Sequence, residues 1–173
     1  MSRELEIEKT YLAKYLPEGL RQNKSLEILD IYLPENSPHP KLRIRKSGDS
    51  YTITKKSPIS TETCSIQNED SIKITAEEFN ALSNVSNRKI HKIRYFYPYQ
   101  EYTAEFDVFL DQLAGLVLID FEFPSPEKLE QFTTPDFCLA DVTEEEIIAG
   151  GVLSGHNLQS IKNTLNKFSY QEI

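Results

Sequence analysis

The chain has 173 residues, of which 39% are hydrophobic and 27% are charged, a composition typical of one globular domain with its own core. Its 19 basic and 27 acidic residues give a net charge of −8 at pH 7, which argues against a general binder of duplex nucleic acid. No apolar run is long enough for a membrane span, and the highly charged first residues do not form a signal peptide, which favours the cytoplasm.

Alternating polar and apolar residues predict β-strands along most of the chain. The first strand contains Leu5 and Ile7, and the others are predicted at 26–33, 41–46, 51–56, 65–74, 89–98, 101–110 and 116–123. A proline-rich loop at 34–40 follows the second strand, and the turn Ser47–Ser50 joins two strands into a hairpin. About eight such strands predict a mainly β (α+β) fold with a closed or nearly closed antiparallel sheet.

Helical signals are fewer and lie between or after the strands. Capping boxes at Thr75 and Thr143 predict two helix starts, and Ser125–Pro126 predicts a third. Leu158–Phe168 has the apolar spacing of an amphipathic C-terminal helix, whereas Gly150–Gly151 is interpreted as a turn before it. The predicted architecture is a single domain, residues 1–173, with a few helices packed outside the sheet.

Charges are sorted by sign along the strands. Acidic residues alternate on the first strand and on the last two, whereas basic residues alternate on strands in between. The charged positions that share a strand face are Glu4, Glu6 and Glu8, Arg43 and Arg45, Lys92 and Arg94, Glu105 and Asp107, and Asp120 and Glu122. One interpretation is a set of solvated outer faces. The other is a polar interior, with the helices covering the apolar faces.

A polar interior of this kind has a defined chemistry. Clusters of Arg and Lys bind phosphate oxygens, and paired carboxylates bind Mg²⁺ or Mn²⁺. Such an ion can bridge phosphate oxygens and assist attack by water. The pattern therefore favours a small, highly charged phosphate compound as the ligand.

The order of these charged pairs resembles the CYTH superfamily, also known as the triphosphate tunnel metalloenzymes. The opening ExExK motif is similar to Glu6-Ile7-Glu8, the RxR motif to Arg43-Ile44-Arg45, and a following lysine strand to Lys55. Later motifs are similar to Lys92-Ile93-Arg94, Glu105-Phe106-Asp107, Asp120-Phe121-Glu122 and Asp141-Val142-Thr143. Each tripeptide is weak alone, but together they follow the family's order over nearly the whole chain.

The resemblance implies a closed eight-stranded antiparallel barrel, the triphosphate tunnel, with charged faces inward and a C-terminal helix. It implies that Mg²⁺ or Mn²⁺ is held by a set of carboxylates: Glu6, Glu8, Asp120 and Glu122. It implies that the triphosphate is bound by five cations: Arg43, Arg45, Lys55, Lys92 and Arg94. Asp107, with Glu105, is expected to assist a second metal ion or to orient the attacking water.

Two departures from the family pattern affect the expected chemistry. The lysine of ExExK falls on Thr10, and the strand that is acidic in many relatives has Gln67 at one of its charged positions. Both changes remove a charge that would contact substrate or metal.

The leading hypothesis is a metal-dependent triphosphatase that releases the terminal phosphate of inorganic tripolyphosphate or a related triphosphate. The alternatives are a class IV adenylyl cyclase, a polyphosphate- or nucleotide-binding module with little turnover, and a β domain whose charged faces are solvated. The expected partner is a small-molecule triphosphate rather than duplex nucleic acid or a membrane, and the chain is expected to be a monomer or a homodimer.

Overall fold

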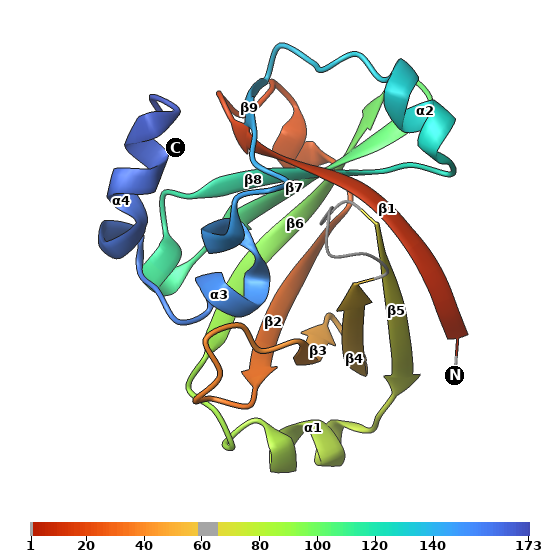
Figure 1. The fold of residues 1–173 in the computed structure, drawn as a ribbon, viewed down its shortest axis with the longest axis vertical. Helices are drawn as coiled ribbons and strands as arrows, with labels where there is room; N and C mark the ends of the chain where they lie inside the picture. Colours follow the sequence, from red (N-terminus) through yellow and green to blue (C-terminus); the bar gives the residue numbers. More distant parts are fainter. Residues whose placement is uncertain (1, 59–65) are drawn as a thin grey trace.

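The computed structural model describes residues 2–58 and 66–173, and the side chains within these ranges except those of 2–6, 58, 66 and 67. It is mainly β, with one antiparallel sheet and a few short helices (Figure 1). The strands are β1 (Ser2–Ala13), β2 (Ser25–Leu33), β3 (Leu42–Ser47), β4 (Ser50–Pro58), β5 (Ile66–Lys73), β6 (Lys89–Tyr99), β7 (Tyr102–Phe109), β8 (Val117–Glu122) and β9 (Cys138–Asp141). The predicted strands are therefore present within the described ranges.

The strand order differs in detail from the eight-stranded prediction. Within the described ranges the sheet has nine strands, in the order β5-β4-β3-β2-β6-β7-β8-β1-β9, and β5 also pairs with the first half of β1. The ninth strand is β9, which the sequence did not indicate and which pairs with β1 through Tyr11 and Asp141. The closed eight-stranded barrel is thus not confirmed, whereas the antiparallel β architecture is.

Two helices cover the outer face of the sheet, opposite the charged residues. α1 (Ala76–Leu82) inserts Phe79 against Ile31 and Ile44 of β2 and β3. α2 (Pro126–Gln131) is followed by Phe132, whose ring centroid lies 4.7 Å from that of Phe121 on β8. These apolar contacts bury the outer face of β2, β3 and β8, so the residues in between on these strands point to the other face.

The C-terminal segment packs on the charged side of the sheet. α3 (Gly150–Leu153) and α4 (Leu158–Lys167) contribute Leu153, Ile161 and Leu165 to one apolar cluster. That cluster also contains the sheet residues Leu12, Tyr32, Ile90, Phe109 and Leu118. We call this end of the sheet the plugged end, because apolar side chains from the C-terminal segment fill it.

Three local predictions about helices are confirmed and two are wrong. The capping box at Thr75 forms as predicted, Ser125 caps α2, and α4 begins at Leu158, the predicted start of the C-terminal helix. At Thr143 no capping box forms, because its hydroxyl donates to Asp141 at 2.6 Å. Gly150–Gly151 is the start of α3 rather than a turn. Among the described residues, no helix is long and apolar enough to cross a membrane.

Candidate active site

The register of the sheet gathers the sorted charges on a single face. Residues directly opposite each other on neighbouring strands share a face. Asp120 lies opposite Glu105, Asp107 opposite Arg94, and Asp30 opposite Arg45. We call the resulting surface the charged face, and its described charged members are Glu8, Asp30, Arg43, Arg45, Lys56, Glu69, Lys73, Lys92, Arg94, Glu105, Asp107, Asp120 and Glu122.

Most of these side chains are withdrawn from water. The side chains of Asp30 and Asp107 are 1% and 2% exposed. Those of Arg43 and Arg94 are each 14% exposed. Buried charges need partners or a ligand, because desolvation of an isolated charge is costly. The interpretation of these strand faces as solvated outer surfaces is therefore wrong, and the polar-interior interpretation fits.

One ion-pair network joins β6, β7 and β8. Arg94 donates to both oxygens of Asp107 at 2.7 and 2.6 Å and to Asp120 at 2.8 Å, and it also contacts Glu105. Lys92 donates to Asp107 as well. The structure thus brings together four predicted site residues around Arg94, and it leaves Asp107 fully engaged with cations.

The pKa values within this network diverge. Burial alone would raise the pKa of Asp107, but Arg94 and Lys92 lower it to about 2. Burial raises the pKa of Glu105 to about 7, although Arg94 acts in the opposite direction and Glu122 adds to the rise. Burial and the nearby charge of Glu8 likewise raise the pKa of Glu122. Asp107 is therefore held in its charged form, whereas burial and neighbouring acids make Glu105 and Glu122 easier to protonate than usual.

A second network lies on β2 and β3 and contains a residue that the sequence analysis missed. Asp30 accepts hydrogen bonds from Arg45 Nε at 2.6 Å and Nη2 at 2.7 Å. Burial opposes its ionisation, but Arg45 and Arg43 hold the pKa of Asp30 below its usual range. This bidentate pair uses two nitrogens of the Arg45 guanidinium, so Arg45 has fewer free donors for a ligand.

Arg43 has donors that the described residues do not satisfy. Its Nε is buried without a hydrogen-bond partner among the described residues, and its ion pairs with Asp30 and Glu69 are long, at 4.0 and 3.8 Å. Buried donors in folded proteins are rarely left unpaired, and an unpaired guanidinium donor on a polar face favours an anionic ligand. Arg43 is therefore the cation of the charged face that is best placed to bind an added anion.

The predicted phosphate-binding residue Lys55 points to the wrong face. Lys55 is exposed and lies opposite Leu42, on the outer side of the β3–β4 hairpin. Its neighbour Lys56 lies opposite Glu69 on the charged face, with its ammonium 3.5 Å from Glu8 and 3.9 Å from Glu69. We therefore replace Lys55 by Lys56 in the candidate site.

The predicted metal ligands are only partly described. Glu8 lies opposite Glu122 across β1 and β8, whereas the side chain of Glu6 lies outside the described part of the chain. Asp120 accepts from the Thr10 hydroxyl at 2.8 Å and from Arg94. No cluster of three or more His, Cys, Asp or Glu among the described side chains is arranged to hold a metal ion. The oxygen donors of Glu8 and Glu122 nevertheless fit Mg²⁺ or Mn²⁺ chemically.

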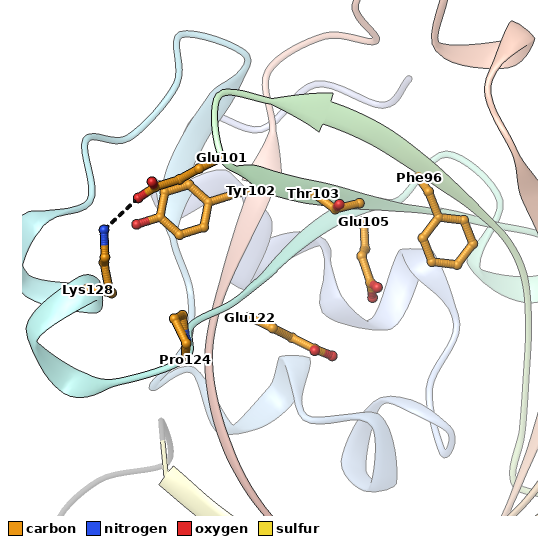
Figure 2. Close-up of a pocket in the computed structure, with 8 residues that line it drawn as sticks. All are labelled: Phe96, Glu101, Tyr102, Thr103, Glu105, Glu122, Pro124 and Lys128. Carbon is orange, nitrogen blue, oxygen red and sulfur yellow. Dashed lines mark hydrogen bonds and ion pairs between the residues drawn. The ribbon is translucent and has the colours of Figure 1, made fainter.

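A cavity of about 500 Å³ opens at the end of the charged face opposite the plugged end. Figure 2 shows Glu105 and Glu122 reaching into this space from β7 and β8, with Phe96 beside them. At its outer rim, Lys128 and Glu101 form an ion pair of 3.0 Å. The carboxylate wall is thus accessible from solution at this end.

Comparisons with known proteins find inorganic triphosphatases of similar sequence and fold. The inorganic triphosphatase of Nitrosomonas europaea is 29% identical over 143 residues, which cover 82% of this chain and 91% of that protein. The crystal structure of the inorganic triphosphatase NE1496 superposes with a TM-score of 0.64 at 27% identity, covering 86% of this chain and 93% of that one. No protein-family model matches the chain.

The resemblance to the CYTH superfamily is confirmed.

More distant structures share the fold. HpAC1 from Hippeastrum, a candidate adenylyl cyclase found to have a dominant triphosphatase activity, is 14% identical with a TM-score of 0.52, covering 92% of this chain and 95% of that one. Thr10 departs from the CYTH pattern, which has a lysine at this position. Its uncharged hydroxyl donates a hydrogen bond to Asp120. Gln67 also departs, and its side chain lies outside the described part of the chain.

Proposed function

We propose that this chain is a triphosphatase that hydrolyses inorganic tripolyphosphate or a related triphosphate on the charged face. The observation that carries the proposal is Arg43, whose buried guanidinium has one donor without a partner among the described residues and lies beside Arg45 and near Lys56. The similarity to an inorganic triphosphatase along 82% of the chain supports the same conclusion. Phosphate binding there would give Arg43 the partners that it lacks.

We propose further that the strands wrap the charged face into a tunnel. The pairing of β5 with the first half of β1 supports this, because β1 pairs in its second half with β8. Figure 1 shows β1 running beside β5, across from β2 and β6. A wrapped sheet would surround the phosphate chain with cations from β3, β4 and β6. A cytoplasmic location and a monomeric or homodimeric state remain predictions.

A divalent cation is part of the proposal because the charged face is rich in acids. Its described strands carry seven carboxylates and six cations, so the face cannot neutralise a triphosphate alone. Glu8 and Glu122 would hold Mg²⁺ or Mn²⁺, together with Glu6 and Asp120 of the predicted set. When bound, such an ion supplies charge neutralisation and Lewis-acid polarisation of the phosphoryl group.

The side chains of the charged face would have separate roles in binding the phosphate and in hydrolysis. Arg43, Arg45 and Lys56 would hold the phosphate oxygens and stabilise the charge that develops on them in the transition state. Asp107 has both oxygens bound by Arg94 and Lys92, so it positions these two cations. Glu105 lines the cavity, from where it would orient the attacking water.

The test is phosphate release from tripolyphosphate, ATP and thiamine triphosphate, each with Mg²⁺ or Mn²⁺ and with excess chelator. We expect chelator-sensitive release from tripolyphosphate. Conversion of ATP to cyclic AMP would instead support the cyclase, and tight binding of tripolyphosphate without release would support the binding module.

The matched variants are Arg43→Ala and Lys55→Ala. Loss of a charge-assisted contact costs about 1.5–3 kcal/mol, so Arg43→Ala should raise KM roughly 10–100-fold. Lys55→Ala removes a lysine of the same hairpin from the outer face and should leave KM unchanged. Equal effects of the two substitutions would contradict the assignment of the charged face.

A further inference from the structure

On five consecutive strands of the sheet, the charged face ends in apolar or aromatic residues at the plugged end. In sheet order from β2 to β1 these residues are Tyr32, Ile90, Phe109, Leu118 and Leu12. Each is at most 8% exposed, and all five share an apolar cluster with side chains of α3 and α4. A close-packed apolar interior leaves little room for an added group and disfavours an anion.

The C-terminal segment that fills this end is fastened to the rest of the fold. Arg88, which lies just before β6, donates to the carbonyl oxygen of Gly151 at 3.0 Å. Near the end of the chain, the Tyr170 hydroxyl donates to the carbonyl oxygen of Gly115 at 2.9 Å and accepts from the Val117 amide at 2.8 Å. Opening the plugged end would break these contacts as well as the apolar packing, so the segment closes this end permanently.

Arg43 is the cation of β3 nearest to the plugged end. It lies opposite Tyr32, whereas Arg45 lies opposite Asp30, one step closer to the cavity. The Tyr32 ring in turn reaches the backbone of α3, because a Cβ at Gly150 would lie 2.1 Å from its hydroxyl oxygen. A phosphate bound by the Arg43 donor that lacks a partner among the described residues would therefore be the innermost one, with Tyr32 next to it.

The opposite end of the charged face is open. The cavity of about 500 Å³ lies there, with Glu105 and Glu122 among its lining residues. This volume is in the range of sites that hold small organic groups. A linear phosphate would enter from this side with one terminal phosphate leading toward Arg43, and an ester group on its other terminus would stay in the cavity.

We propose that the site accepts a phosphate chain only through a free terminal phosphate. The inference rests on the proposed triphosphatase function and on the wrapped sheet, and it deepens them by naming the substrate class. That class is linear triphosphates with at least one unesterified end, which includes tripolyphosphate and its monoesters. A triphosphate esterified at both ends is excluded, because one ester group would need the space beside Arg43 that Tyr32 and the plug fill.

The experiment measures how three small esters inhibit the hydrolysis of tripolyphosphate: methyl diphosphate, monomethyl triphosphate, and dimethyl triphosphate with one methyl group on each end. The dimethyl ester has no free end, whereas methyl diphosphate has one and carries the same full ionic charge. We expect the inhibition constant of dimethyl triphosphate to be at least about tenfold higher than that of methyl diphosphate, because a packed interior accepts an extra methyl group only with strain. Monomethyl triphosphate should bind at least as tightly as methyl diphosphate.

Tyr32→Ala tests whether the plugged end causes this selection. The substitution removes the ring beside Arg43 and should reduce the ratio of the two inhibition constants at least about threefold, through tighter binding of dimethyl triphosphate. The control is Tyr51→Ala, which removes a tyrosine from the outer face, where its ring centroid lies 5.3 Å from that of Phe79. This control should leave the ratio unchanged.

Three results would overturn the proposal. The first is dimethyl triphosphate that binds the wild-type protein as tightly as methyl diphosphate. The second is monomethyl triphosphate that fails to compete, because the site would then require both ends to be free. The third is a folded Tyr32→Ala variant with an unchanged ratio. If this variant does not fold, the comparison in the wild-type protein decides.

Failure of the proposed function gives a different result. A wild-type protein that does not hydrolyse tripolyphosphate would contradict the triphosphatase assignment. Titration calorimetry of methyl diphosphate and dimethyl triphosphate then tests the closed end separately. Equal affinities for the two esters would overturn the inference, whereas weaker binding of dimethyl triphosphate would support it without turnover.

Discussion

At the scale of single residues, the site depends on which of two adjacent side chains faces inward. Lys55 and Lys56 differ only in strand parity, and a shift of one residue moves a side chain to the other face. The alternation of Tyr51 and Ile53 with polar residues already places Lys55 on the apolar side. The family pattern favoured Lys55 nevertheless, and only the register with Glu69 identifies Lys56.

We expect Lys56→Ala to weaken binding of tripolyphosphate and Lys55→Ala to have no effect. Lys56 is partly buried near Glu8 and Glu69, so its removal also leaves these two carboxylates less compensated. Binding affinity from titration calorimetry should fall roughly tenfold, the equivalent of about 1.4 kcal/mol. A larger effect from Lys55→Ala would restore the original prediction.

Asp30 shows why part of the site cannot be predicted from sequence. Its burial depends on Arg45, which is 15 residues away in the chain and meets it only through the β2–β3 pairing. The acidic pairs on β7 and β8 and the basic pairs on β3 and β6 could be predicted, because alternation within a strand already places them on one face. The partner of each charge could not, because it is set by register between strands.

At the scale of elements, His91 joins three parts of the outer surface. Its Nε2 lies 2.7 Å from Glu27 on β2, and its Nδ1 lies 2.9 Å from Asp111, just after β7. Partial burial lowers the pKa of His91, but the two carboxylates outweigh it, and the pKa is raised above its usual value of 6.5. A raised pKa means that the folded protein holds this proton more tightly than the unfolded chain.

The stability from this contact should therefore be complete below about pH 6.5 and lost as the pH rises through the higher pKa of the folded state. We expect His91→Gln to reduce the free energy of unfolding at pH 6 and to have a smaller effect at pH 8.5. Urea unfolding at the two pH values measures this difference. An effect that grows with pH would contradict the assignment.

The contact of α3 with the loop before β3 depends on glycine. A Cβ at Gly151 would lie 2.1 Å from the backbone oxygen of Pro40, whereas one at Gly155 would meet the end of the Arg88 side chain at 2.6 Å. The backbone of Pro40 cannot move aside as easily as the end of the Arg88 side chain. This explains why Gly151 is glycine, at a place where a turn was predicted. α3 packs against a loop that is distant in the sequence, and the local sequence alone does not predict such a contact.

We expect Gly151→Ala to lower the free energy of unfolding by about 1–3 kcal/mol. Gly155→Ala should cost less, because the guanidinium can move. Chemical denaturation of both variants beside the wild-type protein provides the comparison. A greater loss at Gly155 would mean that Arg88, which donates to the carbonyls of Ser37 and Gly151, is the less adaptable neighbour.

At the scale of the whole molecule, ligand binding should stabilise the fold, because the charged face draws on strands from β1 to β8. A ligand at 100 times its dissociation constant contributes about 2.7 kcal/mol. For a protein of this size, that corresponds to a rise in Tm of roughly 5–10 °C. We expect tripolyphosphate with Mg²⁺ to produce this rise in thermal unfolding, and Arg43→Ala to reduce it. A Tm that is insensitive to tripolyphosphate in the wild-type protein would contradict the proposed site.

The pairing of Arg45 and Arg94 with internal carboxylates has a further consequence. In the absence of substrate these acids accept hydrogen bonds from the guanidinium groups. A phosphate ligand must therefore compete with them for the same N–H donors. The measured affinity for phosphate is then a difference between two sets of ion pairs, one internal and one with the ligand. The affinity of such a site for phosphate can change through its acids alone. Replacing one carboxylate by its amide would tighten phosphate binding while every arginine stays the same.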